Sequence, residues 1–310
     1  MQAHFWGTRG SLPAGPDGSE IRQKIRQALI KANGRHFDGA AAVERFMDAE
    51  LEFPLRCSYG GNSSCMEIIG GDHYTVCDMG SGLRRFGQEV MRDPKASQPE
   101  IYNFFISHVH WDHIMGFPFF PPAYVPGNSI RIHCGHPVAV LEDAFRRQQS
   151  APCFPVSWDH LGASIQFVRL EADRWYDIDG LRVKVKRQPH PGDSYGYRFE
   201  QNGKALVYST DAEHKLKSDA ETEGMVEFYR DADLVVFDAM YSLSEMISSK
   251  ADWGHSSNVV GVDLCLRAGA KHYCMFHHDP GCGDETIYGV LPETRRYAEI
   301  VGDGRALEVS

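Results

Sequence analysis

Four side chains that could bind a metal ion stand close together in the stretch SHVHWDHIMG, residues 107–116: His108, His110, Asp112 and His113. The preceding run IYNFFI, residues 101–106, is apolar and predicts a buried strand. On an extended chain His108 and His110 point to the same side, and the tight turn that follows can bring the other two beside them. Imidazole and carboxylate groups suit zinc, manganese or iron. The stretch therefore predicts a metal site at the C-terminal end of a strand.

Three later places offer further ligands at the ends of predicted strands. They are His190 after the strand that begins at Val183, Asp211 after the strand 205–209, and His277 with His278 at the end of the last strand. A single His or Asp in a turn is more often solvated than bound to a metal, so it is the shared position that counts. Strand ends of a layered sheet meet at one edge, and the ligands of one centre must also meet. These places offer the further ligands that a centre with two ions would need.

The charge balance limits the partners that the protein can bind. The chain carries 42 acidic and 32 basic residues, a net charge of −10, which argues against a broad nucleic-acid surface. A small anionic substrate is compatible with this charge, because a metal centre supplies local positive charge. No apolar run reaches the ~18 residues of a transmembrane helix, and the N-terminal MQAHFWGTRGS lacks a signal pattern. We therefore expect no membrane partner and a cytoplasmic location.

The eight cysteines predict reduced thiols. None of them forms a C-x-x-C pair, and several lie in strand-like runs. Buried thiols fit this pattern better than a disulfide framework or a zinc knuckle.

Strands and helices alternate along both halves of the chain, which predicts an α/β fold with a single domain over residues 1–310. Strands are expected at 2–6, 63–69, 73–77, 101–106, 129–134, 165–169, 181–187, 194–200, 204–209, 231–239 and 271–276. Helices are expected at 82–92, 137–148, 219–230, 256–268 and from about 284.

Residues 19–53 differ in texture and predict a helical hairpin inserted near the N-terminus. A Ser19 cap precedes one apolar stripe, made by Ile21, Ile25, Ala28 and Leu29. A second stripe is made by Val43, Phe46 and Met47. Two helices cannot fully bury two such stripes between themselves, so part of this surface should rest on another body. A cap over the active site and a homodimer contact are the favoured hypotheses, and packing at the domain edge is the alternative.

The order of these motifs resembles the metallo-β-lactamase fold superfamily. The resemblance rests on the H-x-H-x-D-H signature at 108–113, followed by His190, Asp211 and His277, and on the turn DMGSG with Asp78. The stretch WGHSSNVVGVDLCLRAGAKHYCMFHHDP, residues 253–280, is similar to the His-Ser-Thr helix, strand and final His of its phosphodiesterase branch. That branch includes ribonuclease Z and cyclic-nucleotide phosphodiesterases. The resemblance covers nearly the whole chain except 19–53, and it implies a four-layer αββα sandwich.

The resemblance also implies two divalent metal ions at the edge of the sandwich. One ion would take His108, His110 and His190, and the other would take Asp112, His113 and His277. Asp211 would bridge them, because a carboxylate has two oxygens and can span ~3.5–4 Å. His278 competes with His277, which is favoured because it lies two residues before Asp279-Pro280. The set contains no cysteine, so zinc and manganese are both open and iron is possible; zinc is the first expectation.

The chemistry implied by this centre is hydrolysis of a phosphodiester. Two ions would lower the pKa of a bridging water towards ~7, ready to attack as hydroxide, and would offset the charge that builds up at phosphorus. By resemblance His255 would protonate the leaving group, and Asp238 would orient the ring of His255. Asp112 is the third catalytic candidate. A capping His in a loop and an Asp at a strand end are the alternatives for the first two.

Two other features have a functional and a structural interpretation. The loop 117–126 holds Phe117, Phe119, Phe120 and Tyr124, which could stack on a flat group or pack over the sheet. Arg9, in the turn after the first strand, could meet an anion, although a lone Arg is more often a surface residue.

The leading hypothesis is a phosphodiesterase for a small substrate of the cyclic-nucleotide kind. Processing of tRNA 3′ ends is the nearest alternative, but the chain is acidic and lacks a recognisable basic arm rich in Gly and Pro. Hydrolysis of a lactone, thioester or β-lactam would use the same first motif, whereas the GHSS helix favours phosphoryl chemistry. A ligand sensor without catalysis is opposed by the intact ligand set.

Overall fold

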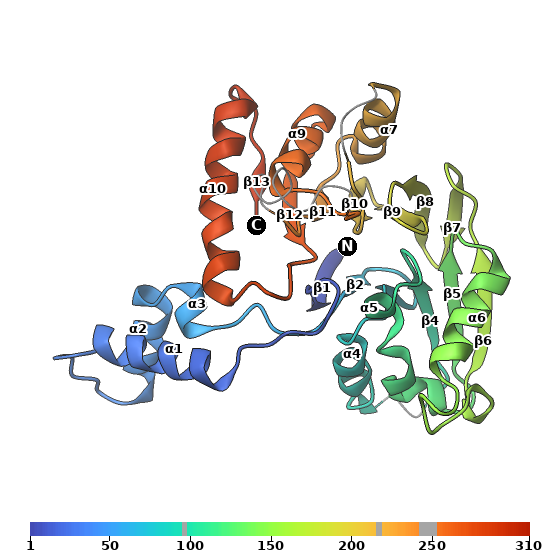
Figure 1. Cartoon of the computed structure of the whole chain (residues 1–310), viewed down its shortest axis with the longest axis horizontal. Coiled ribbons are helices and arrows are strands. Elements are labelled where there is room, and N and C mark those ends of the chain that lie inside the picture. Colours follow the sequence, from blue (N-terminus) through green and yellow to red (C-terminus); the bar gives the residue numbers. More distant parts are fainter. Residues whose placement is uncertain (95–97, 215–218, 242–252) are drawn as a thin grey trace.

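Two β-sheets packed face to face form the centre of the molecule, and helices cover both outer faces (Figure 1). The computed structural model describes residues 1–94, 98–214, 219–241 and 253–310. The layers follow the order helix, sheet, sheet, helix, so the predicted αββα sandwich is confirmed. In such a fold each sheet buries one face against the other sheet and one face under helices.

The N-terminal half forms the first sheet. In spatial order its strands are β1 (Gln2–Gly7), β2 (Cys65–Ile69), β3 (Tyr74–Cys77), β4 (Ile101–Phe105), β5 (Ser129–Cys134) and β6 (Ser164–Arg169). The pairs from β1 to β3 are antiparallel, and those from β3 to β6 are parallel. Parallel neighbours need crossover connections, and α4 (Leu83–Val90) and α6 (Val138–Gln148) lie in two of them.

The C-terminal half forms the second sheet. In spatial order its strands are β13 (Glu308–Val309), β12 (His272–Phe276), β11 (Leu234–Asp238), β10 (Lys204–Ser209), β9 (Ser194–Gln201), β8 (Leu181–Gln188) and β7 (Trp175–Ile178). The pairs from β7 to β10 are antiparallel and those from β10 to β13 are parallel. The crossovers between the parallel strands contain α7 (Asp219–Tyr229), α9 (Asn258–Ala268) and α10 (Asp284–Gly302).

Aromatic side chains fill the space between the sheets. The Phe105 ring on β4 lies 5.0 Å from the Phe199 ring and 5.4 Å from the Tyr197 ring, both on β9 of the other sheet. All three are fully buried. All eight cysteines are free thiols, and four of them are buried: Cys65, Cys77, Cys134 and Cys265.

The structure adds short elements and corrects one helix cap. β7, β13 and the four-residue helix α3 (Phe53–Arg56) were not predicted. The N-cap of α1 is Asp17, whose carboxylate accepts hydrogen bonds from the backbone N–H groups of Ser19 and Glu20 at 2.7 and 2.9 Å. The prediction of a Ser19 cap was therefore wrong, because the carboxylate two residues earlier reaches both free N–H groups.

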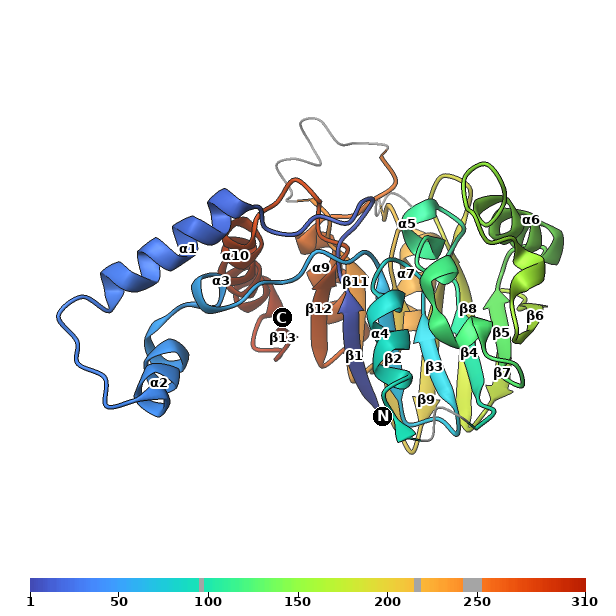
Figure 2. The ribbon, with the colours of Figure 1, turned by 90° about the horizontal axis from the view of Figure 1, so that it is seen from below.

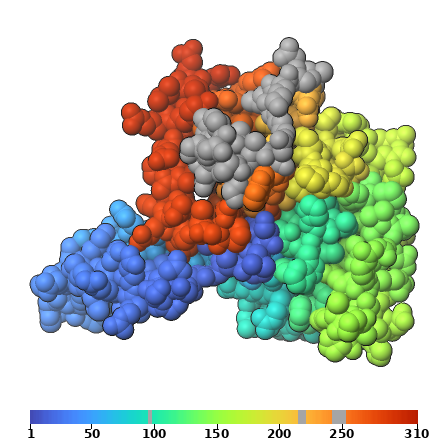
Figure 3. Space-filling model, in the orientation of Figure 1, coloured from blue at the N-terminus to red at the C-terminus, as the bar shows by residue number. Residues whose placement is uncertain are grey.

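The inserted segment forms an arm that projects from the sandwich (Figures 2 and 3). We call α1 (Gly18–Lys31), α2 (Ala40–Glu50) and α3 together the arm. Its base is tied to the body by an ion pair between Lys24 and Asp284 at the start of α10. In both views α1 and α2 lie apart from α5 (Trp111–Ile114), so the arm does not cover that helix in its own chain. Among the described helices, none is long and apolar enough to cross a membrane.

Candidate metal centre

The seven predicted ligands lie directly after the C-terminal ends of four strands. They are His108, His110, Asp112 and His113 after β4, His190 after β8, Asp211 after β10 and His277 after β12. β4 belongs to the first sheet and the other three strands belong to the second, so the site lies where the two sheets meet at one edge. We call this edge the ligand rim.

The first group on the ligand rim consists of His108, His110 and His190. Each offers a ring nitrogen, and these nitrogens all lie within 4.8 Å of one another. His190 Nε2 is 3.2 Å from His110 Nδ1. The backbone carbonyl of Gly254 lies 2.8 Å from His190 Nδ1 and can accept its proton, which leaves Nε2 for the group.

The second group consists of Asp112, His113 and His277. Asp112 Oδ2 lies 3.1 Å from His113 Nε2 and 3.4 Å from His277 Nε2. All three side chains are buried. Two histidines and a carboxylate that converge in this way can hold a divalent ion.

Asp211 stands between the two groups. Its Oδ1 is 3.2 Å from His113 Nε2 and 3.3 Å from His277 Nε2. Its Oδ2 is 3.7 Å from His108 Nε2 and 3.9 Å from His190 Nε2. Each carboxylate oxygen thus faces a different group, which is the arrangement of a bridging ligand.

Three residues of the site hold a left-handed backbone that side chains seldom adopt. The φ angles are 58° at Asp78, 46° at Asp211 and 61° at His277. Such backbone persists where the surroundings impose it, and it often marks functional positions. Gly10 lies directly against His277, since a Cβ on it would come within 2.6 Å of Nδ1 and Cε1 of that ring. The packing therefore favours glycine at position 10, beside the ring of His277.

Asp78 anchors the ligand rim from behind. Its Oδ2 lies 2.8 Å from His113 Nδ1 and accepts a hydrogen bond from the hydroxyl of Tyr208 on β10, also at 2.8 Å. Its Oδ1 accepts the backbone N–H of Ser107 at 2.7 Å. A carboxylate on Nδ1 fixes the tautomer that leaves Nε2 of His113 as the ligand atom.

The pKa values follow from burial and from the concentrated negative charge. Burial, followed by the charge of His113, lowers the pKa of His108 well below its ordinary value, so this ring is neutral. Burial also acts to lower the pKa of His113, but Asp112, Asp211 and Asp78 outweigh it and raise that pKa. Burial acts to raise the pKa of Asp211, and the histidines around it reverse this and lower it well below the ordinary range. The carboxylates are therefore ionised and the site attracts cations.

The residues present fit divalent metal ions. His108 Nε2 and His113 Nε2 are buried and have no hydrogen-bond partner in the part of the chain that the structure describes. His113 Nε2 does contact the carboxylates of Asp112 and Asp211 as an ion pair, but a buried nitrogen without a hydrogen bond is costly in the absence of a ligand. Both nitrogens face Asp211, and a cation placed there would satisfy all of these groups at once. The donor set of imidazoles and carboxylates suits zinc, manganese or iron.

Asp238 and His255 form a pair beside the two groups. His255 Nδ1 lies 2.9 Å from Asp238 Oδ2 and 4.0 Å from Asp211 Oδ2. The other oxygen of Asp238 accepts the backbone N–H of Met240 at 3.2 Å, so this carboxylate is held in place at the end of β11. Burial acts to lower the pKa of His255, but the charge and hydrogen bond of Asp238 outweigh it and raise the pKa to about 9.

The structure distinguishes His277 from His278. His277 Nε2 lies among the ligands, whereas His278 belongs to none of the potential metal groups among the described residues. The ring of His278 instead packs near Tyr59, with ring centroids 5.9 Å apart. Burial, together with the charge of Arg9, lowers the pKa of His278 to about 3. Only His277 is placed to bind an ion.

Arg9 and the aromatic loop are placed by packing. Arg9 is only 2% exposed, donates to the carbonyls of Cys282 and Gly60 at 2.6 and 2.9 Å, and lies 3.8 Å from Asp284. The interpretation of Arg9 as a surface residue was therefore wrong. In the loop 117–126 two of the rings, Phe117 and Phe120, are fully buried, Phe119 is exposed, and the hydroxyl of Tyr124 donates to the carbonyl of Pro118.

Two partners of Asp78 were not predicted. Ser107 stands next to His108, and its hydroxyl also donates to Asp78, at 2.8 Å. Its position between a buried strand and the histidine cluster was a signal that could have been used. Tyr208 lies inside an apolar strand, where nothing local distinguishes a hydrogen-bonded Tyr from a core ring.

Comparison with known proteins agrees with this architecture. The family model described as a beta-lactamase superfamily domain matches residues 74–278. Ribonuclease Z of Haloarcula marismortui is 23% identical over 262 residues, which cover 70% of this chain and 80% of that protein. The metallo-beta-lactamase fold protein YhfI from Bacillus subtilis superimposes with a TM-score of 0.62, at 15% identity over 99% of this chain and 95% of that chain. A diphosphatase from the PhnP family gives a TM-score of 0.61, at 15% identity over 99% and 94% of the two chains.

The chain belongs to the beta-lactamase superfamily. The resemblance to this superfamily and to its branch with ribonuclease Z is confirmed. Family and relatives together indicate a metal-dependent hydrolase.

Proposed function

We propose that the protein is a phosphodiesterase with two metal ions that cleaves a small nucleotide diester. The observation that carries this proposal is the pair His255–Asp238 beside Asp211, because a proton donor at this place serves a poor alkoxide leaving group. Hydrolysis of a thioester has less need of such a donor, because a thiolate leaves readily without a proton. One relative is named ribonuclease Z, and one structural neighbour is named a diphosphatase of the PhnP family. Both names refer to hydrolysis at phosphorus, which supports the same class of chemistry.

The ligand rim would hold the ions in two places. The group of His108, His110 and His190 would hold one, the group of Asp112, His113 and His277 would hold the other, and Asp211 would contact both. When bound, divalent ions supply positive charge that draws in a phosphodiester and lowers the pKa of water.

Asp238 and His255 would handle the proton of the leaving group. The hydrogen bond at Nδ1 holds the imidazole ring and leaves Nε2 as the ring nitrogen that can reach a substrate. The negative charge of Asp238 favours the protonated ring, with the pKa raised to about 9, so His255 can donate a proton at neutral pH. Asp238 acts through this ring and is a positioning residue.

A small substrate fits the charge of the molecule better than a long nucleic acid. The net charge of −10 opposes wide contact with a polyanion. Bound ions would place positive charge at the rim, which favours a substrate with one or two phosphates. Processing of tRNA 3′ ends is the alternative, and an assay with pre-tRNA would reveal it.

Replacement of His255 tests the proposal. His255→Ala should retain both ions, measured by metal analysis, and should lower kcat on a diester with an alkoxide leaving group by ~10²–10⁴-fold. The loss on bis(p-nitrophenyl) phosphate should be much smaller, because p-nitrophenolate leaves without a proton.

A buried histidine outside the ligand groups provides the control. His136 is buried near the Tyr195 ring, and His136→Ala should change neither metal content nor the ratio of the two activities. If His255→Ala slows both substrates equally, a proton-donor role is wrong. If the parent protein with its metals cleaves lactones but no diester, the phosphodiesterase proposal itself is wrong.

A further inference from the structure

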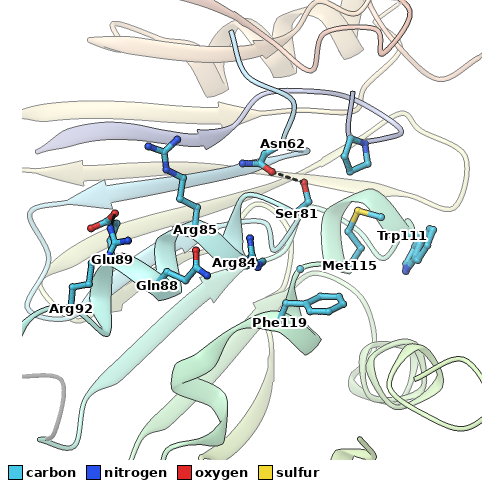
Figure 4. Close-up of a pocket in the computed structure, with 12 residues that line it drawn as sticks. Asn62, Ser81, Arg84, Arg85, Gln88, Glu89, Arg92, Trp111, Met115 and Phe119 are labelled. Atoms are coloured by element: carbon cyan, nitrogen blue, oxygen red, sulfur yellow. Dashed lines mark hydrogen bonds and ion pairs between the residues drawn. The ribbon is translucent and has the colours of Figure 1, made fainter. Parts of the chain in front are cut away.

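A large groove lies beside the ligand rim and contains none of the predicted metal ligands. It has a volume of about 740 Å³ and runs between α4, α5 and the loop that follows α5 (Figure 4). This volume is in the range of pockets that take a small ligand, roughly 300–1,000 Å³. The groove is therefore large enough for a ligand group of its own.

One side of the groove is basic. Arg84 and Arg85, adjacent on α4, are exposed and line the groove, and neither forms an ion pair among the described residues. Arg92 also lines it, but its guanidinium is paired with Glu89. Arg84 and Arg85 leave α4 in different directions (Figure 4), but both line the same groove, and in a chain with a net charge of −10 two guanidinium groups without ion-pair partners among the described residues make this side of the groove attractive to an anion.

The other side of the groove is aromatic. Trp111 is 63% exposed and Phe119 is 54% exposed, and Figure 4 shows both at the end of the groove away from Arg92. Large apolar side chains that stay exposed in one place often mark a binding surface. Flat rings of this kind accept a nucleobase by stacking, whatever its identity.

The groove is joined to the ligand rim by α5. Trp111 follows His110 and precedes Asp112, so one short helix carries both a wall of the groove and a predicted ligand. Ser63 holds this helix, because its hydroxyl donates to the carbonyl of Asp112 at 2.8 Å and contacts Met115 Sδ at 3.6 Å. A molecule in the groove is thus adjacent to one whose phosphodiester lies at the rim.

We infer that the groove binds a second nucleotide, so that the substrate is a dinucleotide-sized phosphodiester instead of a cyclic mononucleotide. The scissile diester would lie at the ligand rim, the neighbouring phosphate at Arg84 and Arg85, and the neighbouring base at Trp111 and Phe119. This inference rests on the proposed phosphodiesterase function and names its substrate class.

The test compares substrates with and without the second nucleotide. In Arg84→Gln/Arg85→Gln, KM for a linear dinucleotide with a 5′-phosphate should rise about tenfold or more. KM for bis(p-nitrophenyl) phosphate and for a 3′,5′-cyclic mononucleotide should stay within about twofold, because neither reaches the groove. Phe119→Leu should also raise KM for the dinucleotide alone.

A second pair of adjacent arginines gives a matched control. Arg146 and Arg147 on α6 are exposed and paired with Glu142 and Asp143, and they do not line the groove. Arg146→Gln/Arg147→Gln removes the same charge and should leave all three KM values unchanged. If both double variants raise KM equally, only long-range attraction is at work and the inference is wrong.

The remaining outcomes also decide the matter. An unchanged KM for the dinucleotide in Arg84→Gln/Arg85→Gln overturns the inference. If the parent protein cleaves no diester, the proposed function fails first, and binding is then measured directly. Isothermal titration of the parent with the dinucleotide should still show an affinity that the Arg84/Arg85 variant loses by about tenfold, and the absence of that difference would overturn the groove as a nucleotide site.

Discussion

The ligand rim and the arm are opposite kinds of surface within one chain. At the ligand rim, most of the charged and polar groups are buried and lie at short distances from one another, as Asp78 and Asp211 do from His113, although His110 is exposed. On the arm, apolar groups are exposed: Ile21, Ile25, Leu29 and Ile30 on α1 are 47%, 56%, 66% and 62% exposed, and no residue of α1 is buried.

Both arrangements run against the usual cost of solvation. Buried carboxylates and imidazoles lose hydration, and an exposed Ile or Leu forgoes roughly 1.5–3 kcal/mol that full burial would supply. A chain can retain buried charges or exposed apolar side chains where a bound ion or a second protein surface offsets their cost. At the rim that component would be a pair of cations, and on the arm it would be another apolar surface.

Removal of the central carboxylate should have the largest effect. Asp211→Ala takes away the ligand that faces both groups, so at least one ion should be lost and activity should fall by more than ~10²-fold, since even outer residues of metal sites cost 10–100-fold. Metal analysis and turnover check this. His278→Ala, at the half-buried histidine beside His277 but outside the groups, should retain both ions. Full metal occupancy in Asp211→Ala would refute the ligand assignment.

Replacement of the arm should leave the rim untouched and should change the molecule elsewhere. With residues 19–53 replaced by a short Gly/Ser linker, we expect unchanged metal content and a lower oligomeric mass by light scattering, because the exposed stripe of α1 would contact a second copy. Ile25→Gln/Leu29→Gln should reproduce the change in mass while keeping Lys24, which anchors the arm to Asp284. An unaltered mass in both variants would make the arm a decoration of the domain edge.

Replacement of His133 should have the smallest effect, and the effect is on stability. His133 is a buried histidine outside the ligand groups, so it shows what burial does to a histidine without a metal. It lies in β5, buried, with Nε2 3.2 Å from Asn103 Oδ1, and burial, followed by the charge of Arg131, lowers its pKa to about 4. Because the unfolded chain has an ordinary pKa of ~6.5, the unfolded state takes up a proton first as pH falls. The contribution of neutral His133 is complete above ~6.5 and is lost between ~6.5 and 4. Between pH 7 and pH 5 the parent should lose ~2 kcal/mol more unfolding free energy than His133→Gln, measured by urea unfolding. Equal losses in the two proteins would contradict this.

The convergence of the candidate ligands at one edge could be predicted from the sequence because its signals are local or ordered. His108 to His113 follow one strand within a few residues, and the later ligands each follow a strand that the apolar pattern reveals. The strands β13 and β7 were not predicted, because two and four residues show little of the alternation that identifies a strand.

Long-range contacts could not be predicted from local pattern. The burial of Arg9 depends on Gly60, Cys282 and Asp284, which are remote in sequence and meet only in the folded chain. The groove likewise combines α4 with α5, and Arg84 and Arg85 gave no signal beyond their adjacency. The direction in which the arm projects could not be predicted either. The sequence shows two apolar stripes but not the surface that each stripe faces.

The position of Asp78 has a consequence for how this chain can change over evolutionary time. Asp78 follows β3 in one sheet, and Tyr208, which donates to it, belongs to β10 in the other. Replacement of Asp78 alone would leave the buried hydroxyl of Tyr208 without its acceptor and would loosen His113, and loss of the Tyr208 hydroxyl would remove one of the donors that hold the Asp78 carboxylate. Asp78 and Tyr208 should therefore vary together among relatives, so that one hydrogen bond couples the evolution of two sheets that are each built from their own half of the chain.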